Sequence, residues 1–390
     1  MTDHLILCAS SGEDGRGIPR SVGPSGGPNT KNRKETDMTV TPNRWLELLF
    51  QIRRAVVGTV LILGLTITGV ASAQTADKGN PYKSIDVSDE ALVRELPGFK
   101  NSFAQVNGTR LHYVEGGKGT PVILMPGWPQ TWWAFHKMMP ALAKNHHVIA
   151  VDLRGMGTSD KPAGGYEKKN MAVDIRELVK SLGYEKAHIV GHDIGAHIAY
   201  SYAAQFPDAT LSTVYLDVSA LPASLADAKL LPAKALSGPF TNDFYIWWFA
   251  FHQVNELPEQ LIEGRAHIYL DWFWKSLLYK QDALTDRDRA VYANAYNTPD
   301  GIRGGNGWYK AFPQDLKDNA TYAPKINTPS LGIGGLGNPL LVDFMNARLS
   351  SPQLTHIQES GHYIMEETPE KVIALMLPFL KSNDPQRARR

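Results

Sequence analysis

An aspartate occupies the position of a catalytic nucleophile in the stretch Gly191-His192-Asp193-Ile194-Gly195. The apolar run Ala187 to Val190 predicts a buried strand and Ala196 to Gln205 predicts a helix, so Asp193 lies at a sharp strand-to-helix turn. The two flanking glycines leave room for the strand and the helix to approach each other around a strained residue. A carboxylate can attack saturated carbon and form an alkyl ester. The pattern therefore predicts Asp193 as a nucleophile.

Hydrolysis of such an ester requires a base that activates water. His362, in Glu359-Ser360-Gly361-His362-Tyr363, follows the last predicted strand, Leu354 to Ile357. A nucleophile followed later in the chain by a histidine is the order found in one group of hydrolytic triads. We therefore expect His362 to be the general base.

A third residue must orient the imidazole, and two carboxylates compete for this role. The loop after the predicted strand Ser330 to Ile333 reads Gly334-Gly335-Leu336-Gly337-Asn338 and contains no carboxylate. Asp217, at the end of the strand that follows the nucleophile turn, is the first choice. Asp343, expected on the helix after the glycine-rich loop, is the second.

Water attack on the ester creates an oxyanion that needs hydrogen-bond donors. Pro126-Gly127-Trp128-Pro129 follows the predicted strand Val122 to Met125 and precedes the first long predicted helix. The backbone N–H groups of Trp128 and Ile194 are the expected donors.

The elements that position these residues alternate between strand and helix, which indicates an α/β fold with a mostly parallel sheet and flanking helices. Asn107-Gly108 between two alternating runs predicts a hairpin, and we expect one helix over Trp132 to Lys144. The alternation stops over residues 219–322, which are aromatic and helical in pattern. We predict a hydrolase-sized core from 74–218 and 323–382, covered by a helical cap from 219–322 above the carboxyl ends of the strands.

The beginning of the chain resembles a targeting segment. Residues 1–37 are rich in Gly, Ser, Pro and charge and are expected to be disordered or upstream of the true start. Residues 38–73 combine basic residues, the apolar run Ala55 to Val70 and the small-residue site Ala71-Ser72-Ala73, which predicts a signal peptide cleaved after Ala73. We therefore expect a secreted or periplasmic protein with no stable membrane association after cleavage. The only cysteine, Cys8, precedes the cleavage site, so the mature chain has no disulfide.

Composition excludes several classes of protein. The formal net charge of the 390 residues is +1 and there is no basic stripe interleaved with aromatics, so no nucleic-acid partner is expected. The 12 histidines are scattered, and His146-His147 is interpreted as a loop beside a strand, so neither a metal nor another cofactor is predicted. The oligomeric state, including a homodimer, is left open.

Taken together, these residues resemble the α/β-hydrolase superfamily, in particular its aspartate-nucleophile branch of epoxide hydrolases and dehalogenases. The stretch from Val151 to Asp160 is similar to a structural loop of that branch. Gly127-Trp128-Pro129-Gln130-Thr131-Trp132, the signal peptide and the glycine-rich loop resemble secreted bacterial epoxide hydrolases, in which the acid moves to the position of Asp217.

The resemblance also implies two cap side chains that donate to the epoxide oxygen. Tyr309 matches the second donor. The first falls near Trp247 or Trp248, where the family has Tyr or His. Both tryptophans are candidates for the wall of a pocket that takes a small apolar substrate.

Three functions follow from this pattern. The first is an epoxide hydrolase that forms a diol through an ester on Asp193. The second is a haloalkane or haloacid dehalogenase, but the family's haloalkane enzymes have Trp where this chain has Ile194, and its haloacid enzymes have Arg in place of Ile194 and His197. The third is a binding protein on an idle hydrolase fold, against which the set of Asp193, His362 and Asp217 counts.

Overall fold

An eight-stranded sheet forms the centre of the fold, with the strand order β1-β2-β4-β3-β5-β6-β7-β8. The computed structural model describes residues 79–222 and 246–385. The pairs β1–β2 and β2–β4 are antiparallel, and the other neighbouring strands are parallel. The strands are β1 (Phe99–Val106), β2 (Thr109–Gly117), β3 (Thr120–Met125), β4 (His146–Val151), β5 (Ala187–His192), β6 (Thr210–Leu216), β7 (Ser330–Gly334) and β8 (Gln353–His356). The predicted α/β fold with a mostly parallel sheet is confirmed.

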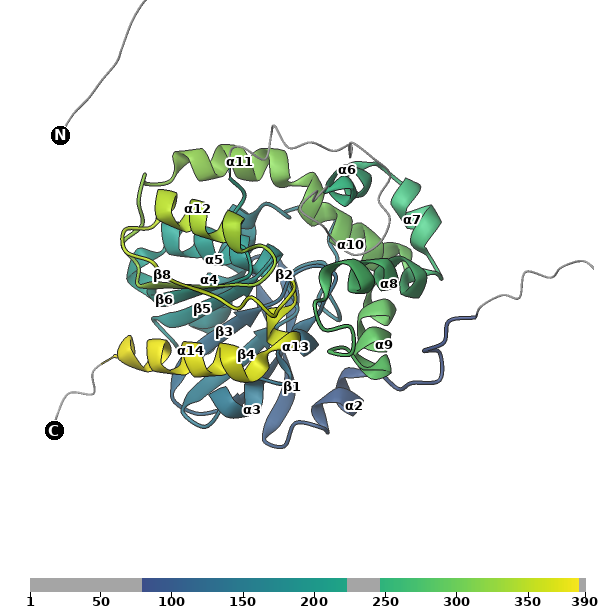
Figure 1. The fold of residues 1–390 in the computed structure, drawn as a ribbon, viewed down its shortest axis with the longest axis horizontal. Helices are drawn as coiled ribbons and strands as arrows, with labels where there is room; N and C mark the ends of the chain where they lie inside the picture. The colour runs from purple at the N-terminus through teal and green to yellow at the C-terminus, as the bar shows by residue number, and fades with distance from the viewer. Residues whose placement is uncertain (1–78, 223–245, 386–390) are drawn as a thin grey trace, which may run out of the picture. The chain divides into compact units, whose positions relative to one another are not determined.

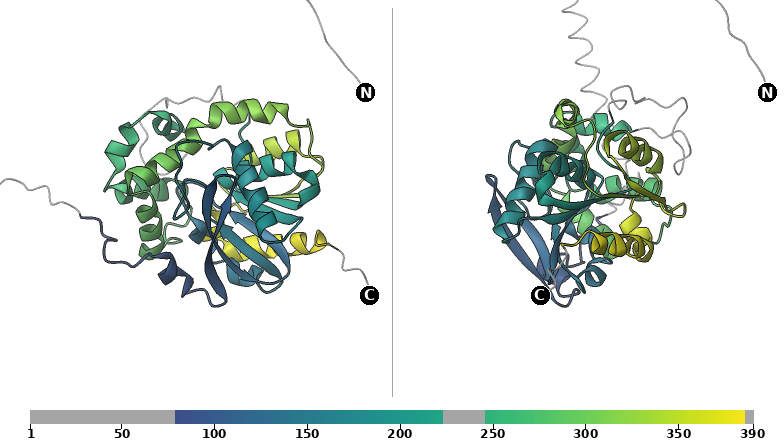
Figure 2. Two further views of the ribbon diagram at one scale, coloured as in Figure 1. Left: turned by 180° about the vertical axis from the view of Figure 1, so that it is seen from behind. Right: turned by 90° about the vertical axis from the view of Figure 1, so that its left-hand side faces the viewer.

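Helices cover both faces of this sheet, as Figures 1 and 2 show. The helices outside the predicted cap are α2 (Asp89–Val93), α3 (Met139–Leu142), α4 (Lys168–Ser181), α5 (Ile194–Gln205), α12 (Asn338–Arg348), α13 (Ile364–Glu367), α14 (Pro369–Ser382) and the short 3-10 turns η1 (Trp132–Phe135) and η2 (Pro207–Ala209).

Six described helices lie between β6 and β7 in the chain, within the predicted cap. They are α6 (Trp247–Gln253), α7 (Leu257–Ile262), α8 (Ala266–Leu277), α9 (Asp286–Ala295), α10 (Pro299–Lys310) and α11 (Phe312–Thr321). The helices α6 to α10 gather on one side of the sheet in Figure 1. The stretch 223–245 of the predicted cap falls outside the described residues. The described helices of the cap and the sheet belong to one compact unit, Asp77–Arg390.

Local sequence explains the predicted hairpin and one wrong prediction. Asn107 and Gly108 both have positive φ, 42° and 72°, as a two-residue hairpin turn requires. The helix predicted over Trp132 to Lys144 is wrong, because the structure has η1 and then the short helix α3. Pro140, in the first turn of α3, has no N–H for a helix continuing from Trp132.

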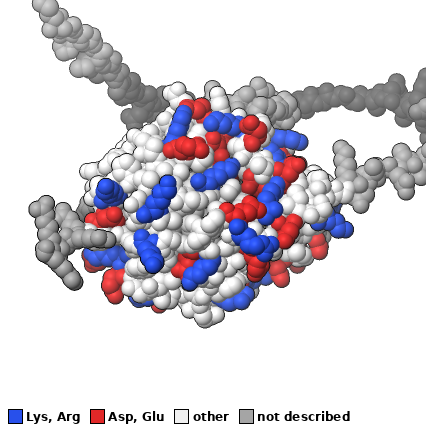
Figure 3. All heavy atoms as spheres, turned by 90° about the horizontal axis from the view of Figure 1, so that it is seen from below, with Lys and Arg blue, Asp and Glu red and all other residues white. Residues whose placement is uncertain are grey.

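The predictions for the beginning of the chain lie outside the described residues. These are the disordered 1–37, the signal peptide 38–73 with cleavage after Ala73, and Cys8. Among the described helices, none combines the length and apolar character needed to cross a membrane. Figure 3 shows acidic and basic side chains interspersed on the face that it views.

Candidate active site

Asp193 sits at a strained turn between β5 and α5. Its backbone angles are φ 48° and ψ −118°, a conformation that L-residues rarely adopt. A Cβ atom on Gly195 would collide with the carbonyl oxygen of Met125 in β3, and one on Gly191 would collide with the carbonyl of Gly195. Both glycines are therefore required for the helix to pack this closely against the strands, which explains the spacing seen in the sequence.

Two backbone N–H groups act on the Asp193 carboxylate. The N–H of Trp128, just after β3, donates to Oδ2 over 2.9 Å, and the N–H of Ile194 also donates to this carboxylate. Burial raises the pKa of Asp193, whereas His362 and these two hydrogen bonds oppose the rise. Because Oδ2 is held by the Trp128 N–H, Oδ1 is the oxygen available for attack on a substrate.

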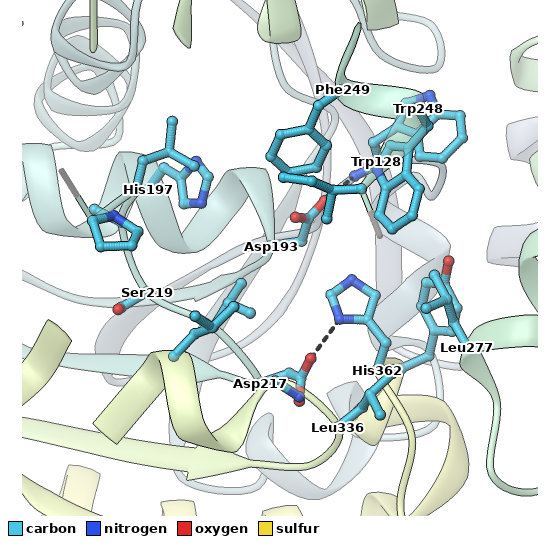
Figure 4. A pocket seen from close by; sticks show the side chains of 18 of the residues that line it. Trp128, Asp193, His197, Asp217, Ser219, Trp248, Phe249, Leu277, Leu336 and His362 are labelled. Atoms are coloured by element: carbon cyan, nitrogen blue, oxygen red, sulfur yellow. Dashed lines mark hydrogen bonds and ion pairs between the residues drawn. The ribbon is translucent and has the colours of Figure 1, made fainter. Parts of the chain in front are cut away.

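His362 lies between Asp193 and Asp217 (Figure 4). Its Nδ1 is 2.5 Å from Oδ2 of Asp217. Burial alone would lower the pKa of His362, but the hydrogen bond and charge of Asp217 and the charge of Asp193 outweigh it and raise the pKa above 6.5. The bond through Nδ1 leaves Nε2 on the side of Asp193, where a base for ester hydrolysis has to act.

The glycine-rich loop after β7 holds the Asp217 carboxylate. The N–H groups of Gly335 and Gly337 donate to Oδ1 over 2.9 and 2.7 Å. A Cβ atom on Gly337 would lie 2.8 Å from both the carbonyl oxygen and Oδ2 of Asp217. The loop therefore supplies hydrogen bonds to an acid that comes from the neighbouring strand, β6. Asp343, the second choice, is exposed on α12.

A mostly apolar cavity of about 420 Å³ opens above these residues. Its described walls combine the candidate catalytic residues with residues of the cap and of the segments after β6 and β7: Trp128, Asp193, His197, Asp217, Val218, Ser219, Ala220, Leu221, Pro222, Ile246, Trp248, Phe249, Phe273, Leu277, Tyr309, Leu336, Gly337, Pro339, Leu340, His362 and Tyr363. The structure thus brings Asp193, His362, Asp217, Trp128 and Tyr309 to one cavity.

Tyr309 of α10 lines the cavity, and its ring packs against the ring of His252 in α6. The two rings stack with centroids 4.6 Å apart. His252 is fixed in turn, because its Nδ1 lies 2.5 Å from Oδ1 of Asn306 and its Nε2 lies 3.1 Å from the hydroxyl of Tyr269. Burial and the charge of Asp193 raise the pKa of Tyr309 well above 10. Its hydroxyl therefore keeps its proton at neutral pH and is available as a hydrogen-bond donor.

Of the two tryptophans predicted for the pocket wall, only one lines the cavity. Trp248 is buried and lines the cavity. Trp247 is not among the described cavity residues, and its ring packs against Trp272 and Phe273, with centroids 5.2 and 6.1 Å away. Adjacent residues of a helix point about 100° apart, so only one of the two can face the cavity squarely. The assignment of Trp247 to the pocket wall is corrected.

Several residues of the cavity were missing from the predicted site. His197, one turn after Asp193 on α5, lines the cavity, as do Phe249, Phe273 and Tyr363. His197 has a sequence signal, because it lies four residues, about one helical turn, after Asp193, which also lines the cavity. His252 has no such sequence signal, since only the packing of α6 against α10 brings it beside Tyr309.

Comparison with known proteins agrees with this geometry. Residues 120–369 match the family model for the alpha/beta hydrolase fold. A soluble epoxide hydrolase of a Corynebacterium species is 33% identical over 283 residues, covering 71% of this chain and 95% of the relative. A fluoroacetate dehalogenase of a Burkholderia species is 26% identical, covering 73% and 94%. The solved structure of the epoxide hydrolase CorEH without ligand matches with a TM-score of 0.64 and 32% identity, covering 73% of this chain and 99% of that one. The chain therefore belongs to the α/β-hydrolase fold family and is a homologue of epoxide hydrolases and of a fluoroacetate dehalogenase.

Proposed function

We propose that this protein is an epoxide hydrolase that works through a covalent ester on Asp193. In the first step, Oδ1 of Asp193 attacks an epoxide carbon and the carbon–oxygen bond of the ring breaks. Tyr309 donates its proton to the oxygen that leaves, which yields a hydroxyalkyl ester. The hydrogen bond from Trp128 to Oδ2 supports this step because it fixes the orientation of the attacking carboxylate.

In the second step, water releases the diol. His362 removes a proton from water, and the resulting hydroxide attacks Cγ of the Asp193 ester. The N–H groups of Trp128 and Ile194, which donate to the carboxylate in the resting protein, then stabilise the oxyanion. When the oxyanion collapses, the bond between Cγ and the diol oxygen breaks and the diol oxygen takes the proton held by His362. The proton of the new Asp193 carboxyl returns to the Tyr309 oxygen, which restores the resting protein. The observation that carries this proposal is the 2.5 Å bond between His362 and Asp217, which gives the protein a base for ester hydrolysis.

The cavity favours an uncharged, apolar epoxide. Its described lining includes Phe249, Phe273 and Trp248 but no Lys or Arg. His197 adds no cation, because burial and the charge of nearby Lys168 lower its pKa well below 6.5. A haloacid would bring a carboxylate into this cavity without a described positive partner on its wall, which is a costly arrangement.

A haloalkane dehalogenase is the second candidate function. The same Asp193 and His362 would serve it, and only the leaving group would differ. The observation in its favour is that two indole rings, those of Trp128 and Trp248, line the cavity. An indole N–H is a donor that can solvate a departing halide.

The mass of the trapped ester distinguishes these functions. We expect His362→Gln to form the Asp193 ester but to release it slowly, so that intact mass spectrometry after exposure to epoxides, haloalkanes and haloacids detects an adduct. The matched control is His356→Gln, at an exposed position at the end of β8, which should accumulate no adduct. An added mass equal to the whole epoxide supports the proposal. An adduct equal to the halide substrate minus hydrogen halide favours dehalogenation, and an idle binding fold gives no adduct with any compound.

A further inference from the structure

Two buried histidines and a carboxylate converge at the end of the sheet that is opposite Asp193. His146 begins β4, His188 lies near the start of β5, and Asp384 follows α14. Nε2 of His146 lies 3.7 Å from Oδ2 of Asp384, and Nε2 of His188 lies 3.1 Å from Oδ1. The ligand atoms of all three residues lie within 4.8 Å of one another. His188 is separated from Asp193 by roughly 16 Å of strand, so this cluster is not part of the catalytic site.

His146 lacks the hydrogen bonds that a buried imidazole needs. Its side chain is only 1% exposed, and neither ring nitrogen has a hydrogen-bond partner within the described chain. Buried polar atoms without a partner are rare and costly. A proton shared between His188 and Asp384 would satisfy those two residues and leave His146 without a partner. A cation placed among the three would give Nε2 of His146 a partner together with His188 and Asp384, and would leave only Nδ1 of His146 without a partner in the described chain.

His188 is already oriented as a ligand by a neighbouring hydroxyl. Its Nδ1 lies 2.8 Å from Oγ of Ser212 in β6. When Nδ1–H donates to Ser212, Nε2 directs its lone pair at the cluster, and such an outer hydrogen bond is common among histidines that bind metals. His146, His188 and Asp384 therefore bring two imidazoles and one carboxylate together around a common point.

A second cluster of similar composition shows the contrast. Asp89, His112 and Asp152 also lie close together. There, however, the protein already satisfies the nitrogens of the histidine: Nδ1 of His112 lies 2.8 Å from Oδ2 of Asp152, and Nε2 lies 3.1 Å from Oδ1 of Asn101. Asp89 and Asp152 also accept hydrogen bonds from Trp132. That cluster is a closed hydrogen-bond network, whereas the one at His146 has unsatisfied donors and acceptors.

We propose that His146, His188 and Asp384 bind one zinc ion, with water as the fourth ligand. Two imidazoles and a carboxylate are typical zinc ligands. Ligand atoms around a tetrahedral zinc ion are about 3.3 Å apart, given bonds of about 2.0 Å. The separation of 3.1 Å between Nε2 of His188 and Oδ1 of Asp384 is close to this value. The ion would attach the segment after α14 to the sheet, so its role is structural. No metal is expected from the scattered histidines of the sequence, because only the fold brings these residues together.

Isothermal titration of zinc into the full, untagged chain after treatment with EDTA tests this site. We expect one zinc ion per chain, a higher melting temperature with zinc, and, with cobalt(II) in its place, the strong visible absorption of tetrahedral coordination. Asp384→Asn, at a partly exposed position that a folded chain tolerates, should weaken zinc binding about tenfold or more, and His188→Gln should abolish it. The matched control is His147→Asn, which removes a histidine bound to Glu115 and Tyr184 instead, and it should bind zinc like the wild type.

Two results would overturn the proposal. One is the absence of stoichiometric zinc binding by the wild-type chain. The other is zinc binding that Asp384→Asn and His188→Gln leave unchanged. Epoxide hydrolysis is not a readout of this experiment, so its outcome is independent of the proposed function.

Discussion

The backbone N–H of His362 donates a hydrogen bond of 2.9 Å to the carbonyl of Leu277, the last residue of the cap helix α8. The loop that carries His362, the proposed base, is therefore attached to the cap. Glu367 reinforces the attachment, because its carboxylate accepts from the N–H of Gly361 on one oxygen and from the N–H groups of Tyr279 and Lys280 on the other, over 2.7 to 2.9 Å.

Removing the Glu367 carboxylate should make the position of His362, the proposed base, less fixed without changing the surroundings of Asp193. Glu367→Ala leaves three N–H groups without their acceptor, so we expect a loss of about 2–4 kcal/mol in the free energy of unfolding and slower ester hydrolysis. Glu367→Gln keeps one acceptor oxygen, so we expect both its stability and its rate of ester hydrolysis to lie between those of the wild type and those of Glu367→Ala. Urea unfolding and single-turnover kinetics measure both effects. Glu370→Gln, at an exposed position three residues on, is the control, and equal effects of the two glutamine variants would contradict the role of Glu367.

Asp217→Asn should separate the two chemical steps. The asparagine oxygen can still accept from Gly335 and Gly337, but its amide then faces Nδ1 of His362 and selects the wrong tautomer. We expect ester hydrolysis to slow by about 10³- to 10⁴-fold, while formation of the ester changes little. Intact mass spectrometry should therefore detect the ester in this variant, as in His362→Gln. Asp343→Asn tests the alternative acid. Should Asp343→Asn accumulate the ester and Asp217→Asn not, the assignment is wrong.

The pKa shifts of Asp193 and His362 predict that the amount of ester depends on pH. Burial raises the pKa of Asp193 above 3.8, and Asp217 raises that of His362 above 6.5. Ester formation is lost as the pH falls through the first pKa, and ester hydrolysis is lost as it falls through the second. Esterification removes the Asp193 charge, but the larger contribution of Asp217 to the His362 pKa remains.

Mildly acidic solution should therefore make the wild-type protein accumulate the ester. We expect a larger esterified fraction at about pH 5.5 than at about pH 8 in rapidly quenched samples, because protonation of His362 at the lower pH stops hydrolysis of the ester. Asp193→Asn controls for adducts elsewhere and should show none at either pH. An esterified fraction that does not change with pH would show that protonation of His362 does not limit hydrolysis.

The turn that carries Asp193 was predictable because it depends on local sequence. The strand, the two glycines and the helix are contiguous, and the structure has them as β5 and α5. The position of the orienting acid was less certain, because Asp217 and the glycine-rich loop belong to different segments of the chain. Only the pairing of β6 with β7 brings Gly335 and Gly337 to that carboxylate.

The cap was harder to predict for a physical reason. Trp247 and Trp248 have the same residue type and adjoining positions. The choice between core and cavity depends on the rotation of α6, in which Trp247 packs against Trp272 and Phe273. Amphipathic periodicity gives little guidance in a segment that is aromatic on most faces. His252 illustrates the same limit, since its contact with Tyr309 depends on the approach of α6 to α10.

The Tyr309 hydroxyl should matter for epoxides more than for other substrates. Tyr309→Phe keeps the stack on His252 but removes the proton donor, so an alkoxide would have to leave without a proton. We expect ester formation from an epoxide to slow by about 10²- to 10³-fold, with hydrolysis of the ester nearly unchanged. Stopped-flow or quenched single-turnover measurements separate these two rates. Tyr322→Phe is the matched control, because its hydroxyl bonds to Ser201 away from the cavity. An unchanged rate of ester formation in Tyr309→Phe would mean that another group protonates the leaving oxygen.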